Sequence, residues 1–78
     1  MLFFFNIRSK DIEDVDQDGM DLPSLEAARS EARRSAREMV AEMILQEEHI
    51  DGMRFEITDE AGRLVATIRF RDVIRLSG

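Results

Sequence analysis

The sequence predicts an α+β domain in the order ββαββ, with a single antiparallel sheet of about four strands and one long helix packed on one face. Three observations support this class. Residues 24–48 repeat apolar side chains every three or four positions, which is typical of an amphipathic helix. Residues 53–70 alternate apolar and polar side chains on both sides of a turn, which is typical of a hairpin. Residues 2–8 form an aromatic run too short for a helix.

Residues 2–8 are expected to form the first strand, because phenylalanine and isoleucine favour strands. Alternation places Phe3, Phe5 and Ile7 on one face of this strand and Phe4 on the other. Two interpretations of Phe4 remain open. It lies under the C-terminal tail of the same chain, or it belongs to an exposed apolar patch that pairs with a second copy.

Residues 9–23 form an acidic connector that is expected to contain a short strand paired with the first. Asp14, Asp16 and Asp18 alternate within this connector, and Gly19 follows them. This pattern matches the first half of an EF-hand calcium loop, in which alternate carboxylates converge on the ion. The bidentate glutamate that completes such a loop is missing. The segment is therefore either a calcium site or an acidic hairpin with an Asp-Gly turn.

The helix over residues 24–48 is expected to begin at Ser24, whose hydroxyl can accept from a free backbone N–H as the N-cap. Its apolar stripe is small in the first half and large in the second. We therefore expect the helix to lie tilted, closest to the sheet at its N-terminal end. The stripe comprises Leu25, Ala28, Ala32, Ala36, Met39, Val40, Met43 and Ile44. His49, the sole histidine, is expected at the surface or as the helix C-cap.

Residues 53–70 are expected to form a hairpin whose turn lies at residues 59–62. One face of each strand is apolar and should pack under the helix, while the other face meets water. The inward set comprises Met53, Phe55, Ile57, Leu64, Ala66, Ile68 and Phe70. The tail, residues 71–78, is expected to close an edge of the sheet or to dock in a partner.

Length and composition narrow the classes of protein that remain. The 78 residues suit a single domain, 1–78, and the absence of cysteine excludes disulfides and thiolate zinc sites. No segment approaches the ~20 apolar residues of a membrane span, and the opening apolar run is too short for a signal peptide. We therefore expect a cytoplasmic protein. The net charge of −6 argues against nucleic-acid binding, which requires a basic patch.

Four segments follow one another along nearly the whole chain: LFFFNIR, the acidic stretch ending in DGMDLPS, LEAARSEAR and MRFEITDEAGRLVATIRF. Together they resemble a family of short bacterial proteins described only as a domain of unknown function. The resemblance implies a stand-alone cytoplasmic domain and brings no catalytic or binding residues. In that family the acidic turn usually has fewer aspartates, so the resemblance implies that the three aspartates are peculiar to this chain.

We expect a protein-interaction or assembly module, homodimeric, that uses Phe4, the open sheet face and the tail. The alternatives are a calcium-binding module at the acidic turn and an antitoxin-like regulatory binder. The strand pair leading into the helix resembles the N-terminal half of HicB-type antitoxins. Arg29, Arg33 and Arg37 form a thin basic stripe on that helix, which also fits an ordinary solvated face.

Catalysis is not expected from this sequence. It contains no cysteine, one histidine, no glycine-rich phosphate loop and no Gly-x-Ser-x-Gly turn. The remaining candidates are carboxylate pairs such as Asp14 and Asp16. They lie in a hydrophilic segment, where burial cannot easily raise a carboxyl pKa to the range of a general acid. No cofactor is expected, and calcium at the acidic turn is the one alternative.

Overall fold

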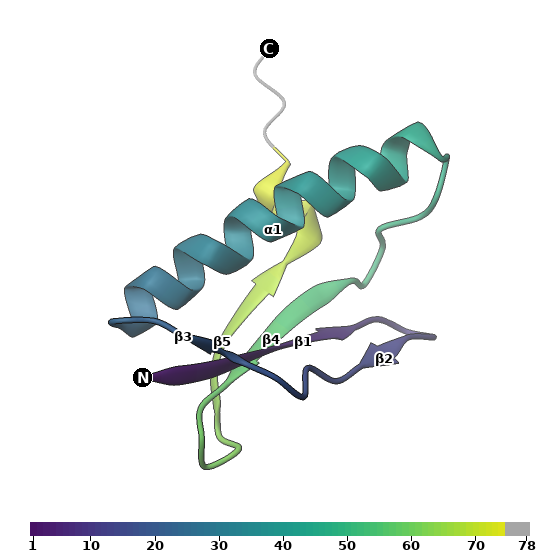
Figure 1. Ribbon diagram of the computed structural model, residues 1–78. Coiled ribbons are helices and arrows are strands. Elements are labelled where there is room, and N and C mark those ends of the chain that lie inside the picture. The colour runs from purple at the N-terminus through teal and green to yellow at the C-terminus, as the bar shows by residue number, and fades with distance from the viewer. Residues whose placement is uncertain (75–78) are drawn as a thin grey trace.

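Strand β1 (Leu2–Arg8) is the centre of the sheet in the computed structural model, which describes residues 1–74 (Figure 1). The α+β class is confirmed. The sheet has five strands and not about four, because the acidic connector supplies two short strands instead of one. The other elements are β2 (Glu13–Asp14), β3 (Met20–Asp21), α1 (Leu25–Leu45), β4 (Arg54–Thr58), β5 (Leu64–Arg69) and the short 3-10 helix η1 (Phe70–Val73).

The strands are all antiparallel and lie in the order β2-β1-β4-β5, with β3 also paired to β1. Phe5 lies opposite Ile57, and Ile7 lies opposite Phe55. Directly paired residues point to the same face, so these four side chains form one apolar surface. Helix α1 covers this face, and the described chain leaves the other face open (Figure 1).

Helix α1 begins at the predicted N-cap, because the Ser24 hydroxyl accepts the backbone N–H of Ala27 at 3.1 Å. Ala28, Ala32 and Ala36 have no exposed surface, so their small side chains allow the helix to approach the sheet closely. Figure 1 shows the helix nearest the sheet at this end and rising away from β1 and β2 toward its C-terminus. The observed tilt agrees with the predicted one.

The helix ends at Leu45, three residues before the predicted boundary at residue 48. The N–H of Glu48 donates to the carbonyl of Met43 at 2.8 Å, and the N–H of Glu47 donates to the carbonyl of Ile44 at 3.1 Å. This is a Schellman closure with Glu47 in the left-handed region at φ 59°. Glycine usually occupies that position. Because Glu47 stands there instead, the sequence shows no stop signal, and the predicted helix is too long. His49 is exposed and lies beyond the cap.

The largest fully buried side chains are Phe3, Ile57 and Phe70, which lie between the sheet and the helix. Phe55 connects them to the rest of the core. Its ring lies 5.3 Å from that of Phe70 and 6.3 Å from that of Phe5, the latter edge to face. Three of the eleven buried apolar residues in the described chain are thus phenylalanines, and their large rings compensate for the small alanine stripe on the helix.

A β-bulge changes the predicted pattern of the last strand. Ile57 pairs with Ala66, but Thr58 pairs with Leu64, so Val65 is the extra residue. In the residues before Ala66, the bulge exchanges the side chains that point toward the core with those that point toward solvent. Leu64, expected in the core, is therefore 58% exposed, whereas Val65, expected outside, packs against the core.

The described part of the tail packs inside the domain. Phe70 and Val73 of η1 are buried, and η1 packs against α1. The expectation that the tail closes a sheet edge is therefore wrong for residues 71–74. Residues 75–78 lie outside the described part of the chain.

We expect Ile57→Ala to lower the free energy of unfolding by about 2–5 kcal/mol, because a fully buried branched side chain would leave a cavity. Leu64→Ala is the matched control and should cost no more than about 0.5 kcal/mol. Urea unfolding of both variants measures the difference. Equal losses would place Leu64 in the core and contradict the bulge.

Candidate functional site

The acidic connector runs along the edge of β1, and we call residues 13–21 the arm. Both ends of the arm pair with β1, and its middle bulges away from that strand. Asp14 pairs with Ile7 at one end, and Met20 pairs with Phe3 at the other. Five arm residues (15–19) therefore lie opposite only three residues of β1 (4–6). At such a bulge the edge of β1 lacks its usual strand partner.

The Asp16 side chain supplies the missing partner. Its Oδ2 accepts the backbone N–H of Phe5 at 3.1 Å. Its Oδ1 accepts the N–H groups of Asp18 at 3.1 Å and Gly19 at 3.2 Å. The N–H of Asp16 donates in turn to Asn6 Oδ1 at 2.9 Å. One carboxylate thus closes the bulge and attaches it to the central strand.

Gly19 is required where the arm crosses β1. Its φ is +73°, and a Cβ at this position would lie 3.0 Å from Leu2 Cδ1 and 3.0 Å from Phe4 Cε1. The reversal of the chain lies elsewhere, at residues 9–12, where the N–H of Ser9 donates to the carbonyl of Ile12 at 2.8 Å. The interpretation of Asp-Gly as the hairpin turn is therefore wrong.

The hydrogen bonds also set the ionisation of Asp16. Burial raises the pKa of this carboxyl. The hydrogen bonds from the N–H groups of Phe5, Gly19 and Asp18 lower it by more, so the pKa lies below its ordinary value of 3.8. Asp16 is the one predicted ion ligand whose oxygens are both engaged with the backbone in the described chain.

Asp14, Asp16 and Asp18 line one open pocket together with Phe5, Val15 and Gln17. Asp14 is exposed and shares the face of its paired residue Ile7, while Asp18 is exposed at the tip of the bulge. Among residues 1–74, no three His, Cys, Asp or Glu side chains are placed to hold a metal ion. Both Asp16 oxygens already accept backbone N–H groups, so a calcium ion would have to share these oxygens with those donors.

Phe4 is half-buried on the open face of the sheet. The arm at Gly19 lies against it, so an element of the same chain does cover this residue. That element is the arm, whereas the described part of the tail packs against α1 through η1.

The charges on α1 are divided between its two flanks. At 100° per residue, Arg29, Arg33 and Arg37 lie on one flank. Arg33 and Arg37 line a shallow pocket with Asp72 and Val73 of η1, so the arginine flank lies on the η1 side of the helix. The opposite flank carries Glu31, Glu38 and Glu42 and lies toward β1.

An apolar surface is left half-covered between this glutamate flank and β1. Helix α1 packs chiefly on β4, β5 and η1, and β1 lies at its margin. Phe3 is therefore 2% exposed under the start of the helix, whereas Phe5 and Ile7 are only half-buried. Met39 and Met43 of the helix are half-buried as well.

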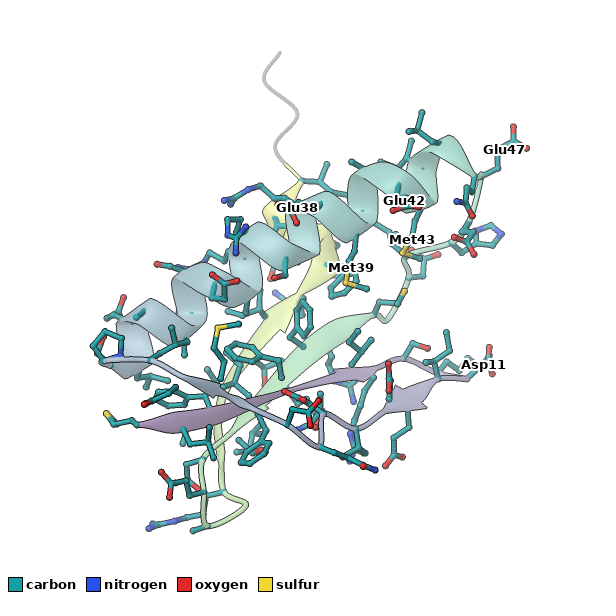
Figure 2. The ribbon with its side chains drawn as sticks, viewed as in Figure 1. Asp11, Glu38, Met39, Glu42, Met43 and Glu47 are labelled. Carbon is teal, nitrogen blue, oxygen red and sulfur yellow. The ribbon has the colours of Figure 1, made fainter. Side chains whose placement is uncertain are left out.

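Acidic residues border this surface on both sides. Figure 2 shows Met39 and Met43 directed from the helix toward the sheet, with Glu38 and Glu42 on the visible flank above them. Asp14 faces the same side from the arm. We call this surface the acid-rimmed face; it comprises Phe5, Ile7, Met39 and Met43 with the rim Glu38, Glu42 and Asp14. Arg34 partly neutralises the rim, since it pairs with Glu31 and, at 3.4 Å, with Glu38.

A second charged feature was missed by the sequence analysis. Arg8 lies opposite Arg54 on β1 and β4, and Arg54 lies opposite Arg69 on β4 and β5. The predicted turn at residues 59–62 would place Arg54 opposite Thr67, whereas the observed register places it opposite Arg69. The pairing of β1 with β4 was not available from the sequence.

Residues 2–71 match a known family, Domain of unknown function (DUF6894). The chain belongs to this family. The resemblance seen in the sequence is therefore confirmed, and this DUF6894 domain receives no activity from its family. Comparison with curated proteins and with solved structures gave no significant match. In the described part of the domain, no helix is both long and apolar enough to cross a membrane.

We expect Asp16→Asn to lower the stability of this DUF6894 domain by about 1–3 kcal/mol at pH 7, because an amide cannot accept from Phe5, Asp18 and Gly19 together. The folded pKa is lowered, so the carboxylate stabilises the fold above its unfolded pKa of 3.8, and this stabilisation is lost as the pH falls through the folded value. Urea unfolding from pH 7 to pH 2 should show the two proteins converging below pH 3.8. Asp18→Asn is the control, and a constant gap between wild type and Asp16→Asn would contradict this role.

Calcium should leave the melting temperature unchanged relative to chelator, because Asp16 is held by backbone donors. A site with a Kd of ~10 µM at ~1 mM calcium would add about 2.7 kcal/mol, a rise of more than about 10 °C in a domain of this size. Thermal melts with magnesium as the control measure this. A calcium-specific rise that disappears in Asp14→Asn would restore the ion-site hypothesis.

Proposed function

We propose that this domain is a protein-interaction module, that its binding surface is the acid-rimmed face, and that its partner presents a basic amphipathic helix. The observation that carries the proposal is the half-covered apolar surface between β1 and the glutamate flank of α1. Phe5, Ile7, Met39 and Met43 remain half-buried there, next to a core whose central residues Phe3, Val40 and Phe55 are buried.

The chemistry of the apolar residues suits a helical ligand. Methionine side chains are flexible and polarisable, so Met39 and Met43 can adapt to bulky side chains of a partner. Phe5 and Ile7 lie two residues apart on a rigid strand and provide a fixed wall opposite them. A partner helix would bury all four side chains, which are partly in contact with water in the free domain.

The charge of the rim selects the partner. Glu42 and Asp14 make no ion pair within residues 1–74, and Glu38 shares Arg34 with Glu31. The face therefore has a negative potential that attracts lysine and arginine and repels acidic segments. The arginine flank of α1 lies on the far side of the helix and does not cancel it.

The test uses a synthetic amphipathic peptide of leucine and lysine, about 18 residues long, with a leucine–glutamate peptide of the same pattern as the control. In ¹⁵N NMR titrations we expect the basic peptide to shift the amides around Phe5, Ile7, Met39 and Met43, and the acidic peptide to shift none of them. Glu42→Lys should weaken binding about three- to tenfold, because it reverses a rim charge.

Glu60→Lys is the matched control, since it makes the same charge change in the turn between β4 and β5. If both variants weakened peptide binding equally, the effect would come from the net charge of the domain, and the proposed site would be wrong. A second copy on this face would instead broaden the same amides with rising protein concentration and no peptide. That result would replace the basic partner by the homodimer predicted from the sequence.

A further inference from the structure

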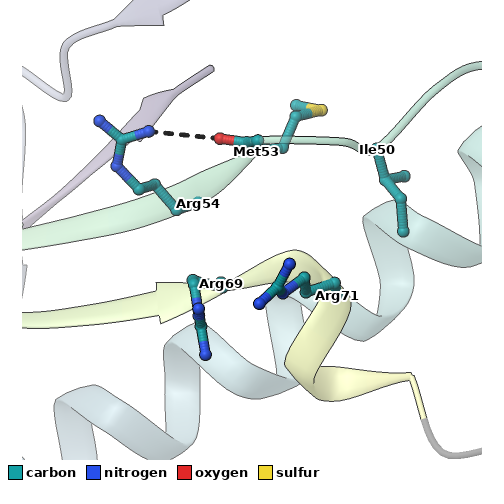
Figure 3. Close-up of a pocket in the computed structure, with 6 residues that line it drawn as sticks. Ile50, Met53, Arg54, Arg69 and Arg71 are labelled. Atoms are coloured by element: carbon teal, nitrogen blue, oxygen red, sulfur yellow. Dashed lines mark hydrogen bonds between the residues drawn. The ribbon is translucent and has the colours of Figure 1, made fainter. Parts of the chain in front are cut away.

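A pocket at the opposite end of the β4–β5 hairpin from its turn has a composition unlike the rest of this acidic domain. It has a volume of about 180 Å³ and is lined by Ile50, Gly52, Met53, Arg54, Arg69 and Arg71 (Figure 3). Three of its six lining residues are arginines, and none is acidic. We call it the arginine pocket.

The arginines are brought together by strand register. Arg54 and Arg69 are direct cross-strand partners, and Arg8 continues the same row on β1. Like charges directly opposite one another destabilise a sheet. Glu56 relieves part of this cost, since its carboxylate lies 2.9 Å from Arg54 Nε and 3.0 Å from Arg8 Nε. The three arginines therefore repel one another, although the protein as a whole is acidic. Such an unfavourable arrangement is typical of functional sites.

The guanidinium groups keep free donors for a ligand. Arg54 uses Nε toward Glu56 and Nη1 toward the carbonyl of Gly52, at 3.3 Å. Arg69 uses Nε toward Asp72 at 2.8 Å. Each guanidinium carries five N–H donors, so both retain free Nη donors, and Arg71 is the third arginine that lines the pocket. The carboxylates of Glu56 and Asp72 orient the arginines without lining the pocket.

We propose that the arginine pocket binds the phosphate group of a small phosphate monoester. Three planar guanidinium groups match the several oxygens and double negative charge of a phosphate better than the two oxygens of a carboxylate. Ile50 and Met53 provide an apolar wall for the organic part of the ester.

The experiment titrates the wild-type domain with phenyl phosphate, inorganic phosphate and benzoate at constant ionic strength, using ¹⁵N NMR. We expect the amides of residues 50–54 and 69–71 to shift with both phosphates, most strongly with the ester, and benzoate to bind more weakly than either. Equal binding of the ester and inorganic phosphate would make free phosphate the ligand. Equal binding of benzoate would contradict phosphate recognition.

Arg71→Gln should weaken binding of phenyl phosphate about tenfold, because it removes one charge-assisted contact. Arg63→Gln is the matched control; it removes the same charge near the turn, where Arg63 lies 3.9 Å from Asp59. Equal weakening by both variants would show only long-range attraction and overturn the site. Arg69→Gln is the second test if Arg71→Gln does not fold. Tighter binding of a thymidine oligonucleotide than of the ester would likewise overturn a small-molecule site.

Discussion

The antiparallel pairing of β1 with β4 is the interaction on which the rest of this structure depends. It joins the first strand of the chain to the hairpin that follows the helix, and it aligns Phe5 with Ile57 and Ile7 with Phe55. The helix buries its alanine stripe chiefly against β4, β5 and η1, and the pairing joins β1 to that layer. The same register places Arg8 beside Arg54, so one set of backbone hydrogen bonds produces both the core and the arginine row.

The acidic arm shows how a local motif can serve the fold. Alternating aspartates followed by glycine are equally suited to converge on an ion and to accept backbone N–H groups. In this chain Asp16 accepts three such groups, one of them from the central strand. The arm needs that contact because its bulge leaves Phe5 without a partner on the arm side of β1, while Ile57 of β4 lies opposite it on the other side. The carboxylate thus protects an edge of the sheet that would otherwise be open to pairing.

The distribution of charge follows from the tilt of the helix. The helix lies toward β5 and η1, where Arg33 and Arg37 line a pocket with Asp72, and its glutamate flank lies on the opposite side. Negative charge therefore collects around the half-covered part of the core. The arginine pocket lies near the end of the helix and at the far end of the hairpin from its turn. The two proposed sites have opposite charge preferences, and solvent screening allows both on so small a domain.

Periodicity and capping by themselves determined the α+β class, the start of the helix at Ser24, the hairpin and the inward faces of Phe3, Phe5, Phe55 and Ile57, because these depend on neighbours close in sequence. Only the tertiary structure decided the role of Asp16, the exposure of Leu64 and the meeting of Arg8, Arg54 and Arg69. Each of these depends on register between distant strands or on a bulge, and a shift of one residue moves a side chain to the opposite face. The local sequence does not indicate strand register or the position of a bulge, so the candidate sites could not be predicted from it.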